Sequence, residues 1–397
     1  MLPEGWRKAS LEDVAEIRSG IARSQKRVEN PITLPYLRVA NVQDGYLDLT
    51  EIRTIEINKA KIDRFSLHIG DVLMNEGGDF DKLGRGDVWR GQITPCLHQN
   101  HVFAVRPDQK ILDSYFLANL SASAYGKGYF LSCAKRSTNL ASINSTQLKQ
   151  FPVLLPPLPE QKKIAAILSA WDRAIEGTEK LLANSQQQKK SLMQQLLTGK
   201  KRLPGFTGKW KVRKFQDLFQ ERIETEREDL PLLSVTANDG IIFQEYSGRK
   251  DISKEDKSKY KRICVDDIGY NTMRMWQGRS CLSDKEGIVS PAYTIVFAKK
   301  NICTAFASYL FKFSPVIHVF YRHSQGLVSD TWNLKFKHFK EISWEIPSLP
   351  EQKTIAAVLT TADEEITALE SDLSRLRREK KALMQQLLTG KRRVKVD

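Results

Sequence analysis

The sequence predicts an α+β fold with a pseudo-two-fold internal repeat. We expect two mixed α/β domains separated by two long helices that form an antiparallel coiled coil. Two long segments of nearly the same sequence align without a gap, and their apolar residues follow a heptad spacing. The stretches before them alternate short strand and helix patterns. Each half is therefore predicted to be a variable domain followed by a repeated helix.

The repeated segment begins with LPEQK at Leu158 and again at Leu349. Both copies continue through IAA and end in LMQQLLTGK, followed by basic residues. Proline and glutamate are favourable in the first turn of a helix, and Gly199 and Gly390 stand where a C-cap is expected. Each copy is therefore predicted to form one helix, over residues 157–200 and 348–391.

The apolar residues of both copies recur at alternating steps of three and four, with a lysine at the same step in each copy, Lys189 and Lys380. Helices of about 40 residues would each be about 60 Å long. If a two-fold axis relates the halves, the helices run antiparallel. The alternative is two separate amphipathic helices, each lying on its own domain. The predicted seam consists of Ile164, Leu168, Trp171, Ile175, Leu182, Leu192, Leu196, Ile355, Leu359, Ile366, Leu369, Leu373, Leu376, Leu383 and Leu387.

The variable segments contain short runs of β-branched and aromatic residues bounded by Gly, Asp, Asn and Pro, such as HVFAVRP and PAYTIVFA. Helical patterns lie between them, at 111–125 and 302–313. The halves echo each other weakly here, as in GDVLMNEGG (70–78) and DDIGYNTMR (266–274). The predicted boundaries are 1–156 for the first domain, 201–347 for the second and 392–397 for a basic tail.

The chain carries a formal net charge of +15 over 397 residues. Such an excess of positive charge usually indicates binding to a polyanion, and double-stranded DNA is the favoured partner. No apolar run is long enough to span a bilayer and no secretory signal is evident, so we expect a cytoplasmic protein without a membrane partner. The five cysteines form no C-x-x-C pair, and His98 and His101 beside Cys96 do not complete a zinc site. We expect reduced thiols and no metal.

Motifs for catalysis are not found. The sequence has no Asn/Asp-Pro-Pro-aromatic tetrapeptide with a glycine-rich cofactor loop, as an adenine methyltransferase requires. It has no G-x-x-x-x-G-K-[ST] phosphate loop for a motor. The chain is therefore predicted not to be an enzyme.

Two segments in each half are candidates for contact with DNA. Segments 75–92 and 270–280 follow the echoed strands, and segments 134–144 and 325–340 are basic and polar. Their side chains suit base edges, phosphates and stacking. The alternative is solvated loops whose arginines pair with Asp79, Asp81 or Asp87, and turn or cap roles for Asn144 and Asn333. The candidates are Arg85, Trp89, Arg90, Lys135, Arg136, Asn139, Asn271, Arg274, Trp276, Gln277, Arg279, Lys335 and Lys337.

Through the two LPEQK…IAA…LMQQLLTGK segments and the weaker repeats, the whole chain closely resembles the specificity (S) subunit of Type I restriction-modification enzymes. The resemblance implies two target recognition domains, one for each part of a split DNA target. It implies a coiled coil that sets their spacing, two modification (methyltransferase) subunits as partners, and restriction (translocase and nuclease) subunits. The complex would use S-adenosylmethionine, with ATP and Mg²⁺ for restriction, and this subunit would bind no cofactor itself.

The sequence leaves two other classes of function open. A free-standing two-fold DNA-binding repressor would also be basic. A coiled-coil scaffold protein would bind DNA without sequence preference, and the net charge speaks against it.

Overall fold

The two repeated segments form the longest helices of the structure, α5 (Leu158–Leu196) and α10 (Leu349–Leu387). Both end shortly before a glycine in the left-handed region, Gly199 (φ 67°) and Gly390 (φ 73°), which glycine adopts without steric cost. The structure is a computed structural model. It describes residues 2–22, 29–78, 80, 83–136, 140–236, 240–248, 256–328 and 331–396.

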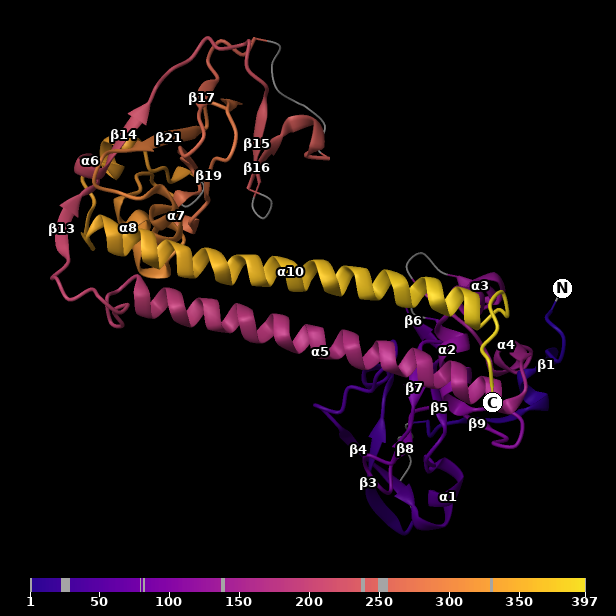
Figure 1. Ribbon diagram of the computed structural model, residues 1–397. Helices are drawn as coiled ribbons and strands as arrows, with labels where there is room; N and C mark the ends of the chain where they lie inside the picture. The colour runs from indigo at the N-terminus through magenta and orange to yellow at the C-terminus, as the bar shows by residue number, and fades with distance from the viewer. Residues whose placement is uncertain are drawn as a thin grey trace. The chain divides into compact units, whose positions relative to one another are not determined.

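The chain divides into two compact units. Unit 1 contains Met1–Glu179 and Ser371–Asp397, and unit 2 contains Lys180–Glu370. Each unit therefore holds one variable domain, together with part of α5 and part of α10 (Figure 1). We call the domain before α5 the first domain and the domain between α5 and α10 the second domain.

Each domain is built around a four-stranded antiparallel sheet with the same topology. In the first domain the strand order is β2 (Ala15–Ser19), β9 (Val102–Pro107), β5 (Val72–Asn75), β7 (Gly86–Val88). In the second domain it is β14 (Phe219–Arg222), β21 (Tyr293–Ala298), β18 (Ile268–Asn271), β19 (Ser280–Leu282). Corresponding strands follow the same sequence order, so the internal repeat extends through the variable domains.

Helices and a terminal strand pair complete each domain. The strand pairs are β1 (Arg7–Ser10) with β12 (Pro152–Leu155), and β13 (Lys211–Lys214) with β22 (Ser343–Ile346). The helices of the first domain are α1 (Ile62–Phe65), α2 (Ser114–Ala122), α3 (Ala124–Cys133) and α4 (Ser145–Lys149). Those of the second are α6 (Phe215–Leu218), α7 (Thr304–Phe311), α8 (Ser314–His323) and α9 (Phe336–Phe339).

The smaller sheets differ between the domains. The first domain has β3 (Pro31–Leu37), β4 (Arg53–Asn58) and β8 (Leu97–His98) in one sheet, and β6 (Gly77–Gly78), β10 (Lys135–Arg136) and β11 (Ala141–Ser142) in another. The second domain pairs β15 (Leu233–Val235) with β16 (Ile241–Phe243), and β17 (Lys261–Ile263) with β20 (Gly287–Val289). The divergence lies outside the four-stranded sheets.

Within each unit the two long helices pack antiparallel. In unit 1, Lys380 of α10 pairs with Asp172 of α5, and Arg393 beyond α10 makes a bidentate ion pair with Glu160 at 2.7 and 2.8 Å. Unit 2 repeats both contacts with the roles of the helices exchanged, through Lys189 with Asp363 and Arg202 with Glu351. The predicted α+β fold, with two mixed domains and two long paired helices, is confirmed.

The seam residues divide into two groups. Ile164, Leu168 and Leu387 belong to the core of unit 1, and Leu196, Ile355 and Leu359 belong to the core of unit 2. Leu373 is buried, whereas Trp171, Ile175, Leu182, Leu192, Ile366, Leu369, Leu376 and Leu383 are half-buried. The start of each helix therefore packs on its own domain as well as against the other helix, and the middle residues are covered less completely.

The LPEQK motif attaches each helix to its domain. The side chain of Gln161 accepts a hydrogen bond from the Asp113 N–H (2.9 Å) and donates to the carbonyls of Ile111 and Pro156. Gln352 makes the matching bonds with Cys303, Asn301 and Pro347. Both glutamines are fully buried, so their amides satisfy backbone groups that would otherwise be unpaired. Among the described helices, none is long and apolar enough to cross a membrane.

Candidate nucleic-acid interface

The structure joins the two candidate segments of each domain. In the first domain, β6 of segment 75–92 pairs with β11 of segment 134–144, and the Ile143 N–H donates to the Glu76 carbonyl at 2.8 Å. In the second domain, the Leu334 N–H donates to the Thr272 carbonyl at 2.8 Å. Segments far apart in sequence thus form one surface in each domain.

These two surfaces occupy the same place in the repeated fold. Asn75 ends β5 and Asn271 ends β18, and their N–H groups donate to the carbonyls of Arg85 and Arg279 respectively. The next residues, Glu76 and Thr272, donate to the carbonyls of His101 and Ala292 at 3.0 Å. The same backbone network therefore carries different side chains in the two domains. We call these surfaces the first and second interfaces.

Arg90 is an exposed cation, but it follows Val88 at the end of β7 that pairs with the start of β5, and so lies at the opposite end of these strands from the first interface. Its guanidinium lies 3.2 Å from the Asp87 carboxylate and 5.8 Å from the centroid of the Tyr115 ring. The alternative predicted from sequence, pairing with an aspartate, is thus observed for Arg90. Burial raises the pKa of Asp87, while the Val88 N–H and Arg90 oppose that rise. Asp79 and Asp81 lie outside the described residues.

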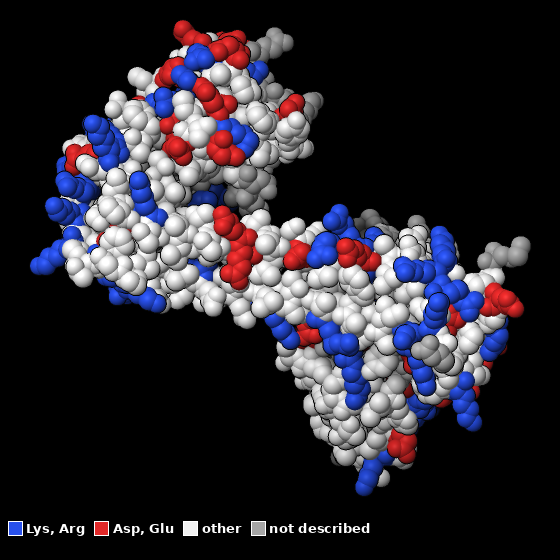
Figure 2. Space-filling model, viewed as in Figure 1, with Lys and Arg blue, Asp and Glu red and all other residues white. Residues whose placement is uncertain are grey.

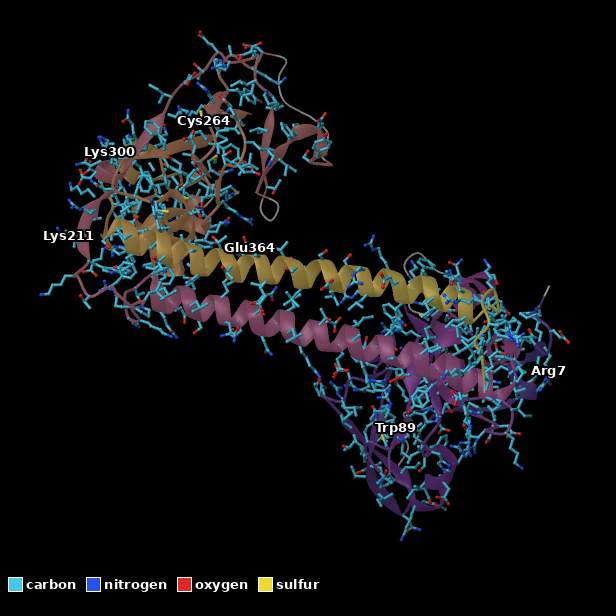
Figure 3. All side chains as sticks on the ribbon, viewed as in Figure 1. Arg7, Trp89, Lys211, Cys264, Lys300 and Glu364 are labelled. Carbon is cyan, nitrogen blue, oxygen red and sulfur yellow. The ribbon has the colours of Figure 1, made fainter. Side chains whose placement is uncertain are left out.

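Trp89 must be corrected from a contact candidate to a core residue. Its side chain is 1% exposed and belongs to a core cluster with Leu73 and Val102; Figure 3 labels Trp89 within the first domain. Its backbone bonds to Asp71 and Gly70, which fixes the start of the loop. A buried indole has no open face on which a base could stack.

The other candidates of the first domain have fewer observed contacts. Arg85 is half-buried, and its Nε is buried without a hydrogen-bond partner in the described part of the chain. Lys135 is exposed on β10. Arg136 belongs to the same strand, and Asn139 lies outside the described residues. Asn144 caps α4 by accepting from the Gln147 N–H at 2.9 Å, which is the cap role considered from the sequence.

The candidates of the second interface gather around two tryptophans. The Trp276 and Trp332 rings meet edge to face, with centroids 5.2 Å apart. Trp276 donates its indole N–H to the Met273 carbonyl at 3.0 Å, and Asn271 accepts from the Met273 N–H in a turn role. Arg274 is half-buried, whereas Gln277 and Arg279 are exposed.

Several basic side chains lie on the segments that carry these tryptophans and Tyr321. Within the described residues, none of the following forms an ion pair: Arg274, Arg279, Arg322, Lys335 and Lys337. Desolvation, helped by Lys337, His323 and Lys335, lowers the pKa of His338, as expected in a positive environment. Elsewhere on the visible face of each unit, acidic side chains lie among the basic ones (Figure 2).

Sequence reasoning missed several residues of these surfaces. His101 pairs with Glu76 at the centre of the first interface, and Tyr321 packs against Trp332 at 4.9 Å in the second. The partners lie in different segments, so local sequence patterns could not join them. Trp332 itself lies within a segment that had been singled out, and an aromatic residue among lysines was the available signal. Among the described residues, no group of three or more His, Cys, Asp or Glu could hold a metal ion.

Both halves of the chain match one known protein family. The model of the Type I restriction modification DNA specificity domain matches residues 3–184 and 208–375, one match for each half. A putative Type I restriction enzyme MjaX specificity subunit from Methanocaldococcus jannaschii is 28% identical, over 99% of this chain and 95% of its own. The EcoKI specificity subunit of Escherichia coli is 25% identical over 48% of this chain and 41% of its own.

Solved structures show the same fold. The HsdS subunit from Thermoanaerobacter tengcongensis superposes with a TM-score of 0.53 at 16% identity, covering 98% of both chains. The S subunit of a Type I restriction-modification system from M. genitalium gives a TM-score of 0.58 at 13% identity, covering 96% of both. The likeness extends over nearly the whole chain, helices and domains together.

Proposed function

This chain belongs to the family of Type I restriction-modification DNA specificity subunits, and we propose that its first and second interfaces each read one part of a split DNA target. Members of this family are the non-catalytic, DNA-recognising subunits of their enzymes. The observation that carries the proposal is the pair of equivalent surfaces, each made by two joined segments at the end of the same strand. Neither alternative, a repressor or a scaffold protein, is favoured.

The contacts proposed for the first interface are Arg85, Lys135, Arg136 and Asn139, and Arg90 is proposed as a contact from the opposite end of β7. Those proposed for the second are Asn271, Arg274, Trp276, Gln277, Arg279, Lys335 and Lys337. Arginine and asparagine can bond base edges in pairs, whereas the lysines would hold phosphates. The cations of the second interface have no carboxylate partner among the described residues, which supports its role, since such a cation is available to a phosphate.

The long helices have a second proposed role. Type I restriction-modification systems combine DNA specificity with methyltransferase and restriction subunits, and their complexes use S-adenosylmethionine, ATP and Mg²⁺. We propose that this subunit binds two modification subunits and the restriction subunits, and that α5 and α10 fix the length of the unread spacer. Within this proposal, residues 1–156 and 201–347 are the recognition domains, and 157–200, 348–391 and 392–397 are the helices and tail.

Chemistry would take place in the partners. Methylation of adenine requires the base to leave the duplex, and we propose that the methyltransferase subunit receives it while this chain holds the flanking DNA. This chain itself would bind no cofactor. The complex would work in the cytoplasm, where its DNA lies.

Salt dependence of DNA binding tests the proposed contacts. In the complex with its modification subunits, the double variant Lys335→Ala/Lys337→Ala should bind more weakly at every salt concentration. A plot of the logarithm of the association constant against the logarithm of the salt concentration should also become less steep by about two, one for each lost phosphate contact. The control Lys209→Ala/Lys211→Ala removes the same charge from exposed lysines near β13 and should leave the slope unchanged. Equal slopes for the two variants would refute the contacts.

A further inference from the structure

An apolar patch lies at the centre of the second interface. Its aromatic members are Trp276, Tyr321 and Trp332, and we include the exposed apolar residues Met273 and Leu327 of the same segments. The Trp332 ring meets Trp276 at 5.2 Å and Tyr321 at 4.9 Å, both edge to face. These ring contacts, together with the Leu334–Thr272 backbone bond, hold these segments in one arrangement.

The patch presents mostly carbon, together with the Tyr321 hydroxyl and the Trp332 indole N–H. Met273 and Tyr321 are 45% and 43% exposed, and Leu327 is fully exposed. Trp276 has already given its indole N–H to the Met273 carbonyl. Single exposed apolar residues are ordinary on a protein surface, whereas a contiguous group usually marks an interaction site.

The surroundings identify the occupant as DNA. The five basic side chains described above lie on the same segments as the patch, and none has a carboxylate partner in the described part of the chain. An apolar surface with such cations on its segments suits a ligand with anionic edges and apolar groups between them. Duplex DNA has this character, with its phosphates on either side of each groove.

The first interface differs at the same positions. Glu76, paired with His101, stands where the second domain has Thr272. Ala141, two residues before Ile143, stands where the second domain has Trp332, two residues before Leu334. At these two positions the first interface has a hydrogen-bonding pair and a small side chain, whereas the second has an aromatic ring available for apolar contact.

We propose that the second-interface patch reads the 5-methyl group of thymine in its part of the target. The methyl group is the apolar feature that a base pair displays in the major groove, and apolar side chains are its usual partners. This inference rests on the proposed function, since it assigns a base feature to one of the two readers. It makes Tyr321, Leu327 and Trp332 specificity-determining residues.

Uracil substitution tests this directly, because uracil is thymine without the methyl group. Once the target is known, each thymine of a bound duplex is replaced singly by deoxyuridine, in both strands and both parts, and titrated with the specificity–modification complex. At least one replacement in the part read by the second domain should weaken binding about fourfold, the worth of one buried methyl group. Full affinity for every replacement in that part would overturn the proposal.

A variant of the protein without the patch should then lose the difference in affinity between the thymine and uracil duplexes. In Tyr321→Ser/Leu327→Ser the uracil and thymine duplexes should bind equally. Val265→Ser is the matched control: it removes an exposed apolar side chain from the turn before β18, at the opposite end of that strand from the patch. It should keep the difference. A difference that persists in the double variant would overturn the patch as the reader, even with the split motif intact, whereas loss of the split motif would instead count against the proposed function.

Discussion

Gln161 and Gln352 show how one side chain can fix a domain to a helix. Each lies in the first turn of its helix and is fully buried, and each bonds one N–H and two carbonyls of the preceding domain. An amide suits this task because it donates and accepts at once. The glutamine of LPEQK is therefore explained by structure rather than by DNA contact.

Replacing this glutamine should destabilise its unit. Gln352→Leu leaves one buried and two partly buried backbone groups without this partner, so we expect the free energy of unfolding to fall by about 2 kcal/mol in urea titration. Gln187→Leu, at an exposed position of α5, is the control and should change stability by less than about 0.5 kcal/mol. Equal stability of the two variants would show that water or a shifted backbone replaces the lost bonds.

Asp87 should make the free energy of unfolding of unit 1 decrease as the pH rises. Its pKa is raised by desolvation, so its folded state favours the protonated form more than the unfolded state does. Its contribution to stability is therefore fully present below the usual pKa of aspartate and is lost as pH rises through the raised value. Asp87→Asn removes this loss and should be more stable than the parent at neutral pH but not at pH 3. Thermal unfolding across this range checks the sign, and a difference that does not depend on pH would contradict it.

At the scale of the elements, two reciprocal ion pairs fix how the helices meet. Lys189 of α5 pairs with Asp363 of α10 in unit 2, and Lys380 of α10 pairs with Asp172 of α5 in unit 1. A parallel, in-register pairing of the two copies would instead bring the equivalent lysines together. Polar residues in a coiled-coil seam commonly specify register in this way.

Charge reversal tests this specification. Lys380→Asp places two carboxylates together and should lower the free energy of unfolding by about 1 kcal/mol, because the pair is only partly buried. The exchanged pair Lys380→Asp/Asp172→Lys should recover most of the loss. A double-mutant cycle measures the coupling, and a coupling energy near zero would show that the pair does not contribute.

A break in the seam should be far more damaging than a charge change. Leu373 is a buried seam residue within α10. Leu373→Pro removes a helical hydrogen bond and should cost about 3 kcal/mol or more. We expect loss of helix by circular dichroism and loss of the split motif from the methylome of cells carrying the variant. An unchanged motif would contradict the role of the helices as the spacing element.

The whole molecule shows which levels of organisation a sequence reveals. The helices were predictable because the repeat, the glycines and the heptads agree. The joining of residues 76 and 143, or of 272 and 334, depends on strand pairing between distant segments, which local patterns do not encode. Trp89 misled the prediction because its loop is rich in glycine and charge, yet its own side chain points into the core. The sequence therefore identified the segments of the proposed interfaces, but it did not predict which of their residues contact one another.

The two-reader account also predicts modular behaviour. Exchange of residues 1–156 for the corresponding domain of another specificity subunit should change one part of the recognised sequence and leave the other part intact. Residues after this boundary include the LPEQK glutamine, so the junction requires a donor with matching backbone partners. Methylome sequencing of the chimaera reads the outcome, and a change in both parts would contradict independent readers.

The central claim is that this chain selects a split DNA sequence for methylation by its partner. The most direct measurement is co-expression with the cognate modification subunit in a host without methylation, followed by genome-wide mapping of methylated adenine by single-molecule sequencing. The account predicts one motif with two short defined parts around an unread spacer of fixed length. Methylation at a continuous motif, or no methylation despite a stable complex with an active partner, would contradict it.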